Sequence, residues 1–354
     1  MGDRPGALGR WGAVVRQRIL IWGAGAIGGT VGAYLCRAGH DITFVDVETE
    51  HVAAIRDPAR GLRLTGPIIT TTVIAPAFLP ADLEGAWDHV LLCVKAQHTV
   101  GATQALLPHL STGGAVVSLQ NGLCEASVAD IVGRERVIGA FINFSADWIA
   151  PGEVLYGGTG AFVLGELDGR ITDRLQTLHD VIQAGFEPNA IMVPDVQAYL
   201  WGKLGYAALL FAQALGQLGI ADCLARPELL PLWRALGREV AEVASSIGIR
   251  QRGFNGFDPA AFAPGATEAK ARQSVAAMVA FNRPSAKTHS GIWRDLAVRK
   301  RRTEVDLQIL PVVATGAAHG IACPKCAALT RMIHEIEDGV RPMTDDNLIE
   351  LLNV

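Results

Sequence analysis

The stretch RILIWGAGAIGG, residues 18–29, decides the fold of this chain. Its run Ile19-Leu20-Ile21-Trp22 is continuously apolar, as in a strand that is buried on both faces of a parallel sheet. Glycines follow at the spacing G-x-G-x-x-G, and a helical pattern begins among them. A buried strand, a glycine-rich turn and a helix in this order predict the first unit of a doubly wound α/β domain.

The chain from Arg18 to about Asp195 alternates short apolar runs with amphipathic stretches, which predicts a sheet covered by helices. Helices are expected near 26–38, 48–56, 97–109 and 123–132. Strands are expected at 18–22, 42–45, 90–94 and 115–119, and later at 136–146, 153–157, 161–165 and 187–193. Glycine-rich turns between the later strands favour antiparallel hairpins. We therefore expect a Rossmann domain with a mixed sheet over residues 18–194.

After Pro194 the apolar residues recur at helical spacing, and strand signals become few. Helices are expected at 196–218, 228–247, 268–281 and 302–319. Residues 250–265 hold three Phe, three Gly and two Pro, which is typical of a structured loop. Residues 195–354 are therefore expected to form an all-helical domain, and the Gly- and Arg-rich residues 1–17 a disordered extension.

The composition excludes several classes of protein. The net charge of −4 gives no general attraction to nucleic acid, and no apolar run approaches the roughly 20 residues that span a bilayer. Six cysteines at irregular spacing do not make a disulfide framework, and residues 1–17 lack the apolar core of a signal peptide. Cys323-x-x-Cys326 has no second cysteine pair, so we expect no metal site. These features favour a cytoplasmic protein, and we expect a monomer or homodimer.

The glycine-rich turn is expected to bind the pyrophosphate of a nicotinamide dinucleotide. Gly23 permits the tight turn, Gly25 lets the phosphates approach the backbone, and Gly28 lets the helix pack closely on the strand. Amide groups at the start of the helix then bind the anion. A glycine-rich turn without a ligand is the alternative. The residues expected at the cofactor are Gly23, Ala24, Gly25, Ala26, Ile27 and Gly28.

Asp46 ends the second strand, 23 positions after Gly23 and close to the roughly 20-residue offset of the carboxylate that binds the adenosine ribose. Such a carboxylate repels a 2′-phosphate, and the residues from Val47 to Glu50 supply no arginine to hold one. Asp46 and Val47 therefore favour NAD. The alternative is that Asp46 caps the helix that begins near Glu48.

Four separated motifs resemble the ketopantoate reductase (2-dehydropantoate 2-reductase) family, from about Arg18 to Leu329. They are GAGAIGG at 23–29, CVKAQHT at 93–99, LQNG at 119–122 and TEVD at 303–306. The resemblance implies a Rossmann domain followed by a helical domain, with the substrate in the cleft between them. It also implies NADP as the usual cofactor and the reduction of a 2-oxo acid to a 2-hydroxy acid, a step of pantothenate biosynthesis.

The resemblance assigns the role of catalytic lysine to Lys203, in the motif Trp201-Gly202-Lys203-Leu204. Its chemistry suits the role, because hydride delivery to a ketone builds negative charge on the oxygen, which an ammonium stabilises and then protonates. Partial burial lowers the pKa of a lysine toward neutrality. The alternative is a solvated helix lysine.

The resemblance places further residues in the same cleft. Lys95 and Asn121 follow two strands at the edge of the sheet where ligands bind, and both are expected at cofactor and substrate. Glu304 matches a glutamate that serves the substrate and orients the active site, and Ser290 lies near a serine that binds the substrate carboxylate. The alternatives are a strand-end turn, a surface lysine and an ordinary helix carboxylate.

The chain departs from the family at two positions on the lysine helix. The family has asparagines four and eight residues after the lysine, where this chain has Ala207 and Phe211, on the same helix face as Lys203. We therefore expect an apolar wall at the substrate and a family relative that acts on a bulkier or more apolar 2-oxo acid or ketone, with NAD and oxidation of the 2-hydroxy acid as the variant cofactor and direction. Ketopantoate itself remains a candidate substrate.

The rival functions are another hydroxyacid or imine-reducing dehydrogenase and a non-catalytic dinucleotide sensor.

Overall fold

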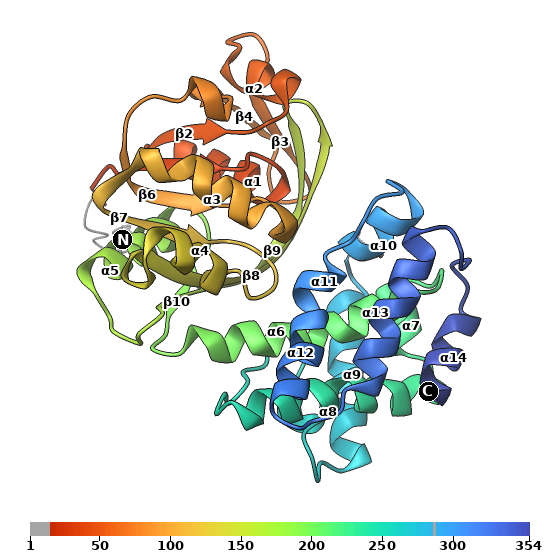
Figure 1. Ribbon diagram of the computed structural model, residues 1–354. Helices are drawn as coiled ribbons and strands as arrows, with labels where there is room; N and C mark the ends of the chain where they lie inside the picture. Colours follow the sequence, from red (N-terminus) through yellow and green to blue (C-terminus); the bar gives the residue numbers. More distant parts are fainter. Residues whose placement is uncertain (1–14, 286–287) are drawn as a thin grey trace, which may run out of the picture.

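The computed structural model describes residues 15–285 and 288–354 and has a sheet domain followed by a helical domain (Figure 1). This arrangement confirms the expected fold class. Helix α6 (Val196–Gln213) leads from the sheet domain into the helical one. Most of the expected N-terminal extension, residues 1–14, lies outside the described residues. Gln17 is already part of the fold, because its carbonyl accepts from the amide of Asp41 at 2.8 Å.

Within the described residues, ten strands form one mixed sheet in the order β4-β3-β9-β8-β7-β6-β1-β2-β5, with β10 paired to β9. The strands are β1 (Arg18–Trp22), β2 (Asp41–Val45), β3 (Leu62–Thr65), β4 (Thr71–Val73), β5 (Ala77–Phe78), β6 (Trp87–Leu92), β7 (Leu110–Ser118), β8 (Val137–Ala150), β9 (Glu153–Glu166) and β10 (Ile191–Met192). The chain leaves β1 for β2 on one side and returns to β6 on the other. The carboxyl ends of β1 and β6 therefore form the switch point at which such sheets bind ligands.

Helices cover both faces of the central parallel strands, and β1 shows why its residues are apolar throughout. Ile21 faces a core formed with α1 (Ala26–Arg37) and α5 (Asp173–Gly185). Leu20 faces a second core formed with α3 (Thr99–Leu106) and α4 (Glu125–Val132). Helix α2 (Thr49–Arg56) follows β2 at the edge. Burial on both faces removes the alternation expected of a half-exposed strand.

The prediction of separate strands at 153–157 and 161–165 is wrong. Strand β9 runs through the glycines without a turn and pairs antiparallel with β8 along its length. The pairing shifts register near Ser145 and Gly158, so the glycines mark an irregularity inside a strand. A side chain at Gly160 would come within 1.4 Å of the Asn143 carbonyl oxygen, which explains why this position lacks one. The short strands β3, β4 and β5 were not predicted.

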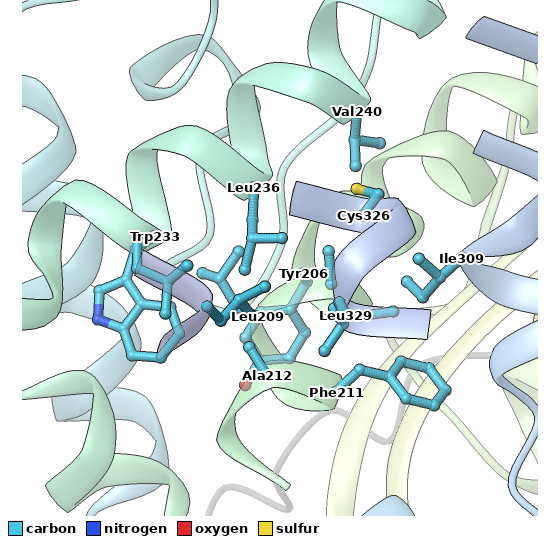
Figure 2. Close-up of a cluster of buried hydrophobic side chains, with 14 of the residues drawn as sticks. Tyr206, Leu209, Phe211, Ala212, Trp233, Leu236, Val240, Ile309, Cys326 and Leu329 are labelled. Atoms are coloured by element: carbon cyan, nitrogen blue, oxygen red, sulfur yellow. The ribbon is translucent and has the colours of Figure 1, made fainter. Parts of the chain in front are cut away.

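The helical domain packs around α6 and α8 (Figures 1 and 2). Its other helices are α7 (Ile220–Leu224), α8 (Leu230–Ser246), α9 (Glu268–Asn282), α10 (Gly291–Ala297), α11 (Val305–Gln308), α12 (Leu310–Ala318), α13 (Pro324–Glu337) and α14 (Asp346–Asn353). The single helix expected at 302–319 is instead split into α11 and α12. Pro311 lies at the start of α12, where it cannot donate the amide that would continue α11. No helix in the described ranges has the length and apolarity to cross a membrane.

The loop 250–265 is irregular as expected, and it lies against α6 at Gly202. The amide of Arg252 donates to the Ala198 carbonyl at 2.8 Å. A Cβ at Gly202 would come within 2.0 Å of the Arg252 carbonyl oxygen, so the glycine lets the loop backbone touch the helix. This contact is one residue from Lys203 and fixes the loop beside it.

The substitution Gly202→Ala tests this contact. Alanine favours a helix by about 0.5–1 kcal/mol over glycine, but here the loop must move, and overpacking costs about 1–3 kcal/mol. We expect a net loss in the free energy of unfolding, measured by urea denaturation. The control is Gly101→Ala on α3, where a Cβ meets nothing within 4 Å and the gain is expected alone. Equal gains in both variants would contradict the account.

Candidate active site

The three glycines of the turn have different surroundings, and these match the expected roles. Gly23 has φ +97°, and a Cβ there would lie 2.9 Å from the Val94 amide nitrogen. A Cβ at Gly28 would lie 2.0 Å from the Gly23 carbonyl oxygen, so this glycine allows α1 to pack on β1. Gly25 has nothing within 4 Å of the same position and begins α1 without a side-chain cap. Open space beside uncapped amides is the geometry that binds a phosphate.

Two side chains hold Ala24, in the middle of this turn, from either side. The Ala24 amide donates to Asp46 Oδ2 at 2.7 Å. The Ala24 carbonyl lies 2.9 Å from His51 Nε2, and the Gly152 amide donates to His51 Nδ1 at 2.8 Å. These partners make His51 a neutral imidazole protonated on Nε2. Sequence reasoning missed His51, because nothing in the sequence links it to the turn between β8 and β9.

Asp46 also orders the entry to α2. Its Oδ1 accepts from the amide of Glu48 at 3.1 Å, while α2 itself begins at Thr49 without a side-chain cap. The alternative that Asp46 is the N-cap of this helix is therefore not what the structure shows. Both oxygens already have one backbone partner, and each retains a free lone pair for a ribose hydroxyl. The role of Asp46 in cofactor choice stays a prediction.

Lys203, Asn121 and Glu304 lie together at the junction of the two domains. Lys203 Nζ, on α6, donates to Asn121 Oδ1 at 2.7 Å and to the Ile142 carbonyl at 2.6 Å. Asn121 follows β7, and its Nδ2 donates to Glu304 Oε2 at 3.4 Å. Glu304 Oε1 accepts from the Ala96 amide at 2.9 Å. The three residues expected to be catalytic thus form one hydrogen-bonded chain from the edge of the sheet to the helical domain.

The surroundings of Lys203 make its ammonium a weaker base than usual. The residue as a whole is partly exposed, but its ammonium has two hydrogen-bond partners and lies 5.6 Å from the centre of the buried Phe141 ring. Burial lowers the pKa of Lys203 to about 8, against the opposing effect of the Glu304 and Glu125 carboxylates. A pKa near neutrality suits a group that must give up and regain a proton.

Glu125 is a buried carboxyl beside this chain that sequence reasoning missed. It is the first residue of α4, only 3% exposed, and neither of its carboxylate oxygens has a hydrogen-bond partner. Burial raises the pKa of Glu125 to about 7, and the charge of Lys203 lowers it. Position 125 lies four residues after Asn121, and the sequence indicates only the start of a helix there.

Lys95 joins the two domains at the same edge of the sheet. It follows β6 directly and precedes the short 3-10 helix Ala96–His98. Its ammonium pairs with Asp295 on α10, a carboxylate only 4% exposed. The resemblance placed Lys95 at the cofactor and substrate, and the structure brings it to the domain junction, one residue before the amide that binds Glu304.

Three arginines share the carboxylates at this junction. Arg294 and Arg299 both pair with Asp147 on β8, and Arg299 and Arg301 pair with Asp295 at 3.2 and 2.9 Å. Together with Lys95, four cations face two carboxylates. The excess of positive charge favours an anionic ligand in the cleft. Arg299 and Arg301, from the basic run 299–302, therefore lie at the domain junction, whereas Arg302 pairs with Glu337 and Asp338 at the end of α13.

Of the residues expected at the substrate, Ala207 and Phe211 lie in the helical core, and Ser290 caps a helix. Phe211 has no exposed surface and packs with Leu329 and Ile309 (Figure 2). Ala207 is 6% exposed. Ser290 is 5% exposed, and its hydroxyl accepts from the Trp293 amide at 3.1 Å as the N-cap of α10. The expected apolar wall is thus part of the core around α6, and substrate contacts of Ala207 and Ser290 stay predictions.

Cys323 and Cys326 lie buried at the start of α13. Across the described part of the chain, no group of three or more His, Cys, Asp or Glu side chains is placed to hold a metal ion. Burial raises the pKa of Cys323 to about 11 and also raises that of Cys326. The Glu239 carboxylate accepts from the amides of Lys325 and Cys326, both at 2.8 Å, and so stabilises the start of α13.

Known proteins match both domains. Residues 19–169 match the family model of ketopantoate reductase PanE/ApbA, and residues 195–337 match that of its C-terminal domain. A 2-dehydropantoate 2-reductase from Archaeoglobus fulgidus is 28% identical over 326 residues, 92% of this chain and 99% of the relative. A PanE/ApbA family ketopantoate reductase from Ralstonia eutropha JMP134 is 26% identical, with a TM-score of 0.76 over 92% of this chain and 100% of that one.

A more distant likeness concerns the fold alone. The ternary structure of a D-mandelate dehydrogenase with NADH and anilino(oxo)acetate has a TM-score of 0.78 at 21% identity, over 92% of this chain and 100% of that one. The two family models together cover most of the sequence, including the glycine-rich turn, Lys203 and Glu304. The chain therefore belongs to the ketopantoate reductase family and is an NAD(P)-dependent oxidoreductase that acts on a 2-oxo acid.

Proposed function

We propose that this enzyme reduces a 2-oxo acid to the 2-hydroxy acid with Lys203 as the proton donor and NADH as the hydride donor. The observation that carries the proposal is the Lys203 ammonium, which is enclosed by protein yet bonded to Asn121 at 2.7 Å on the ligand-binding edge of the sheet. Charged groups with burial-shifted pKa values cluster at functional sites, which supports a catalytic role for Lys203.

The residues of the turn fit a nicotinamide dinucleotide. The open space at Gly25 and the uncapped start of α1 accept its pyrophosphate, and Asp46 lies where the adenosine ribose is bound. The bound dinucleotide supplies the hydride. The fixed position of Ala24, between Asp46 and His51, keeps the turn in shape before the ligand arrives.

Lys203 acts at the carbonyl oxygen of the substrate. As hydride reaches the carbon, negative charge grows on the oxygen, and the ammonium stabilises it and transfers a proton from Nζ to form the hydroxyl. Asn121 holds Nζ in position, and Glu304 holds Asn121 and the Ala96 amide. Because the Lys203 pKa is about 8, the donor is protonated at neutral pH and loses its proton above that value.

The substrate carboxylate is expected near the basic cluster. Lys95 and Arg294 come from different domains and are each paired to one carboxylate, so an incoming anion competes for cations that are already close. Ala207 supplies no hydrogen bond where the family has an asparagine, which favours an apolar substituent on the oxo acid. A dehydrogenase that oxidises an apolar 2-hydroxy acid is the second candidate, supported by the same residue.

The variant Lys203→Ala tests the proton donor. We expect kcat to fall by about 10²–10⁴, because the alkoxide loses its positioned acid, while the dissociation constant of the dinucleotide changes less than about threefold. Steady-state rates and fluorescence titration with NADH measure the two quantities. The control is Lys270→Ala, a lysine exposed on α9. Full turnover in Lys203→Ala would remove this residue from the mechanism.

The cofactor and substrate are tested together by comparing kcat/KM for NADH and NADPH, each with ketopantoate and with phenylglyoxylate, a bulky apolar 2-oxo acid. We expect NADH and phenylglyoxylate to be preferred. Asp46→Asn removes the charge that repels a 2′-phosphate and is expected to raise the NADPH to NADH ratio by roughly tenfold. Glu84→Gln, at an exposed position outside the helices and strands, is the matched control.

A preference for NADPH and ketopantoate would have a different meaning. Strong reduction of ketopantoate with NADPH alone, unchanged in Asp46→Asn, would contradict the proposed cofactor and the more apolar substrate. It would leave the role of Lys203 untouched, because that role is measured with whichever pair the enzyme uses.

A further inference from the structure

We propose that Glu125 is a positioning residue for proton transfer, a buried carboxylate that keeps the Lys203 ammonium charged for the reaction without itself touching the substrate. The inference rests on the proposed role of Lys203 as proton donor. It stands on the hydrogen-bonded chain of Lys203, Asn121 and Glu304 at the domain junction, and on the buried carboxylate of Glu125, four residues after Asn121, which has no hydrogen-bond partner of its own.

The position of Glu125 is unusual for a residue at the start of a helix. An acidic side chain in the first turn usually faces solvent, where it stabilises the helix dipole modestly. Glu125 instead is 3% exposed, and removing a carboxylate from water costs far more than the dipole returns. The helix dipole alone does not account for a glutamate at this buried position.

The surroundings leave the Glu125 carboxylate without a hydrogen bond. Ser118 and the amide of Glu125 itself face the carboxylate and favour its charged form, but neither meets hydrogen-bond geometry with its oxygens. The Ser118 hydroxyl lies 3.5 Å from Gln120 Oε1 instead. Buried polar groups are nearly always satisfied within a fold, and those that are not are frequently functional.

The charged group that acts on Glu125 is Lys203, on α6, although the two side chains share no hydrogen bond or ion pair. Each group favours the ionised form of the other, since Lys203 lowers the Glu125 pKa and Glu125 raises the Lys203 pKa. Glu304, which precedes α11, acts on Lys203 in the same direction. The remaining titratable neighbour is Cys124, whose pKa is raised to about 12 by burial, so it stays a neutral thiol in the working range.

The balance of these charges gives Glu125 a definite effect on the reaction. Burial alone drives Lys203 toward its neutral form, in which it cannot donate a proton to the alkoxide. The Glu125 and Glu304 carboxylates both oppose this, while Asn121 and the Ile142 carbonyl accept hydrogen bonds from the ammonium. Loss of the Glu125 charge therefore lowers the pH at which the Lys203 ammonium loses its proton.

The test compares pH profiles of kcat/KM for carbonyl reduction in wild-type enzyme, Glu125→Gln, Glu125→Asp and Asp130→Asn. The wild-type rate is expected to fall above about pH 8, where Lys203 loses its proton. In Glu125→Gln this fall is expected to begin about 0.5–1 pH unit lower, because the neutral amide no longer stabilises the ammonium. Glu125→Asp keeps the charge and is expected to stay near the wild-type profile. Asp130→Asn removes one charge from the exposed side of α4 and is expected to change nothing.

A second measurement works even if Glu125→Gln does not fold. In wild-type enzyme labelled with ¹³C-glutamate, one carboxyl resonance is expected to titrate near pH 7, and its midpoint is expected to rise in Lys203→Gln, which has lost the nearby positive charge. An unchanged midpoint, or an unshifted pH profile in Glu125→Gln, would overturn the proposal. An active Lys203→Ala would instead overturn the proposed function, and the two failures are thus distinguishable.

Discussion

The hydrogen bond from Lys203 Nζ to Asn121 Oδ1, 2.7 Å long, is the interaction on which the rest of this structure depends. It joins the first helix of the second domain to the carboxyl edge of the sheet, the edge at which the glycine-rich turn also lies. Glu304 extends the link through Asn121 to the Ala96 amide. One short chain of polar atoms thus connects α6, the loop after β7, the loop after β6 and the segment before α11.

The electrostatics of the junction follow from that link. Enclosing an ammonium lowers its pKa, and two carboxylates, Glu304 and Glu125, raise it part of the way back. Farther along the junction, Lys95 and Arg294 pair across the domains with Asp295 and Asp147. In the proposed mechanism, Lys203 exchanges a proton with the substrate, and the cations around Asp295 and Asp147, which outnumber these carboxylates, attract the substrate carboxylate. The family membership is consistent with both.

Local sequence was sufficient to predict the strand, turn and helix at 18–37 and the change to helices after Pro194, because these depend on apolar period and glycine spacing. The resemblance to the family, and not the local pattern, singled out Lys203, Asn121 and Glu304, which the structure joins by hydrogen bonds. Neither indicated Glu125 or His51, whose importance comes from contacts made only when distant segments pack, such as His51 with Gly152. The glycines at 157–160 led to the wrong prediction of a turn. A bulge inside a strand and a turn between two strands have the same local composition, so the sequence alone does not separate them.

The central claim is that Lys203 gives its proton to the substrate oxygen while Asn121 holds it in place. A crystal structure of the enzyme with oxidised dinucleotide and a 2-hydroxy acid tests it most directly. The account predicts that the substrate hydroxyl lies about 2.6–3.2 Å from Lys203 Nζ, with the Asn121 contact kept. A complex in which Lys203 bonds only to Asn121 and the Ile142 carbonyl, while another side chain meets the hydroxyl, would contradict it.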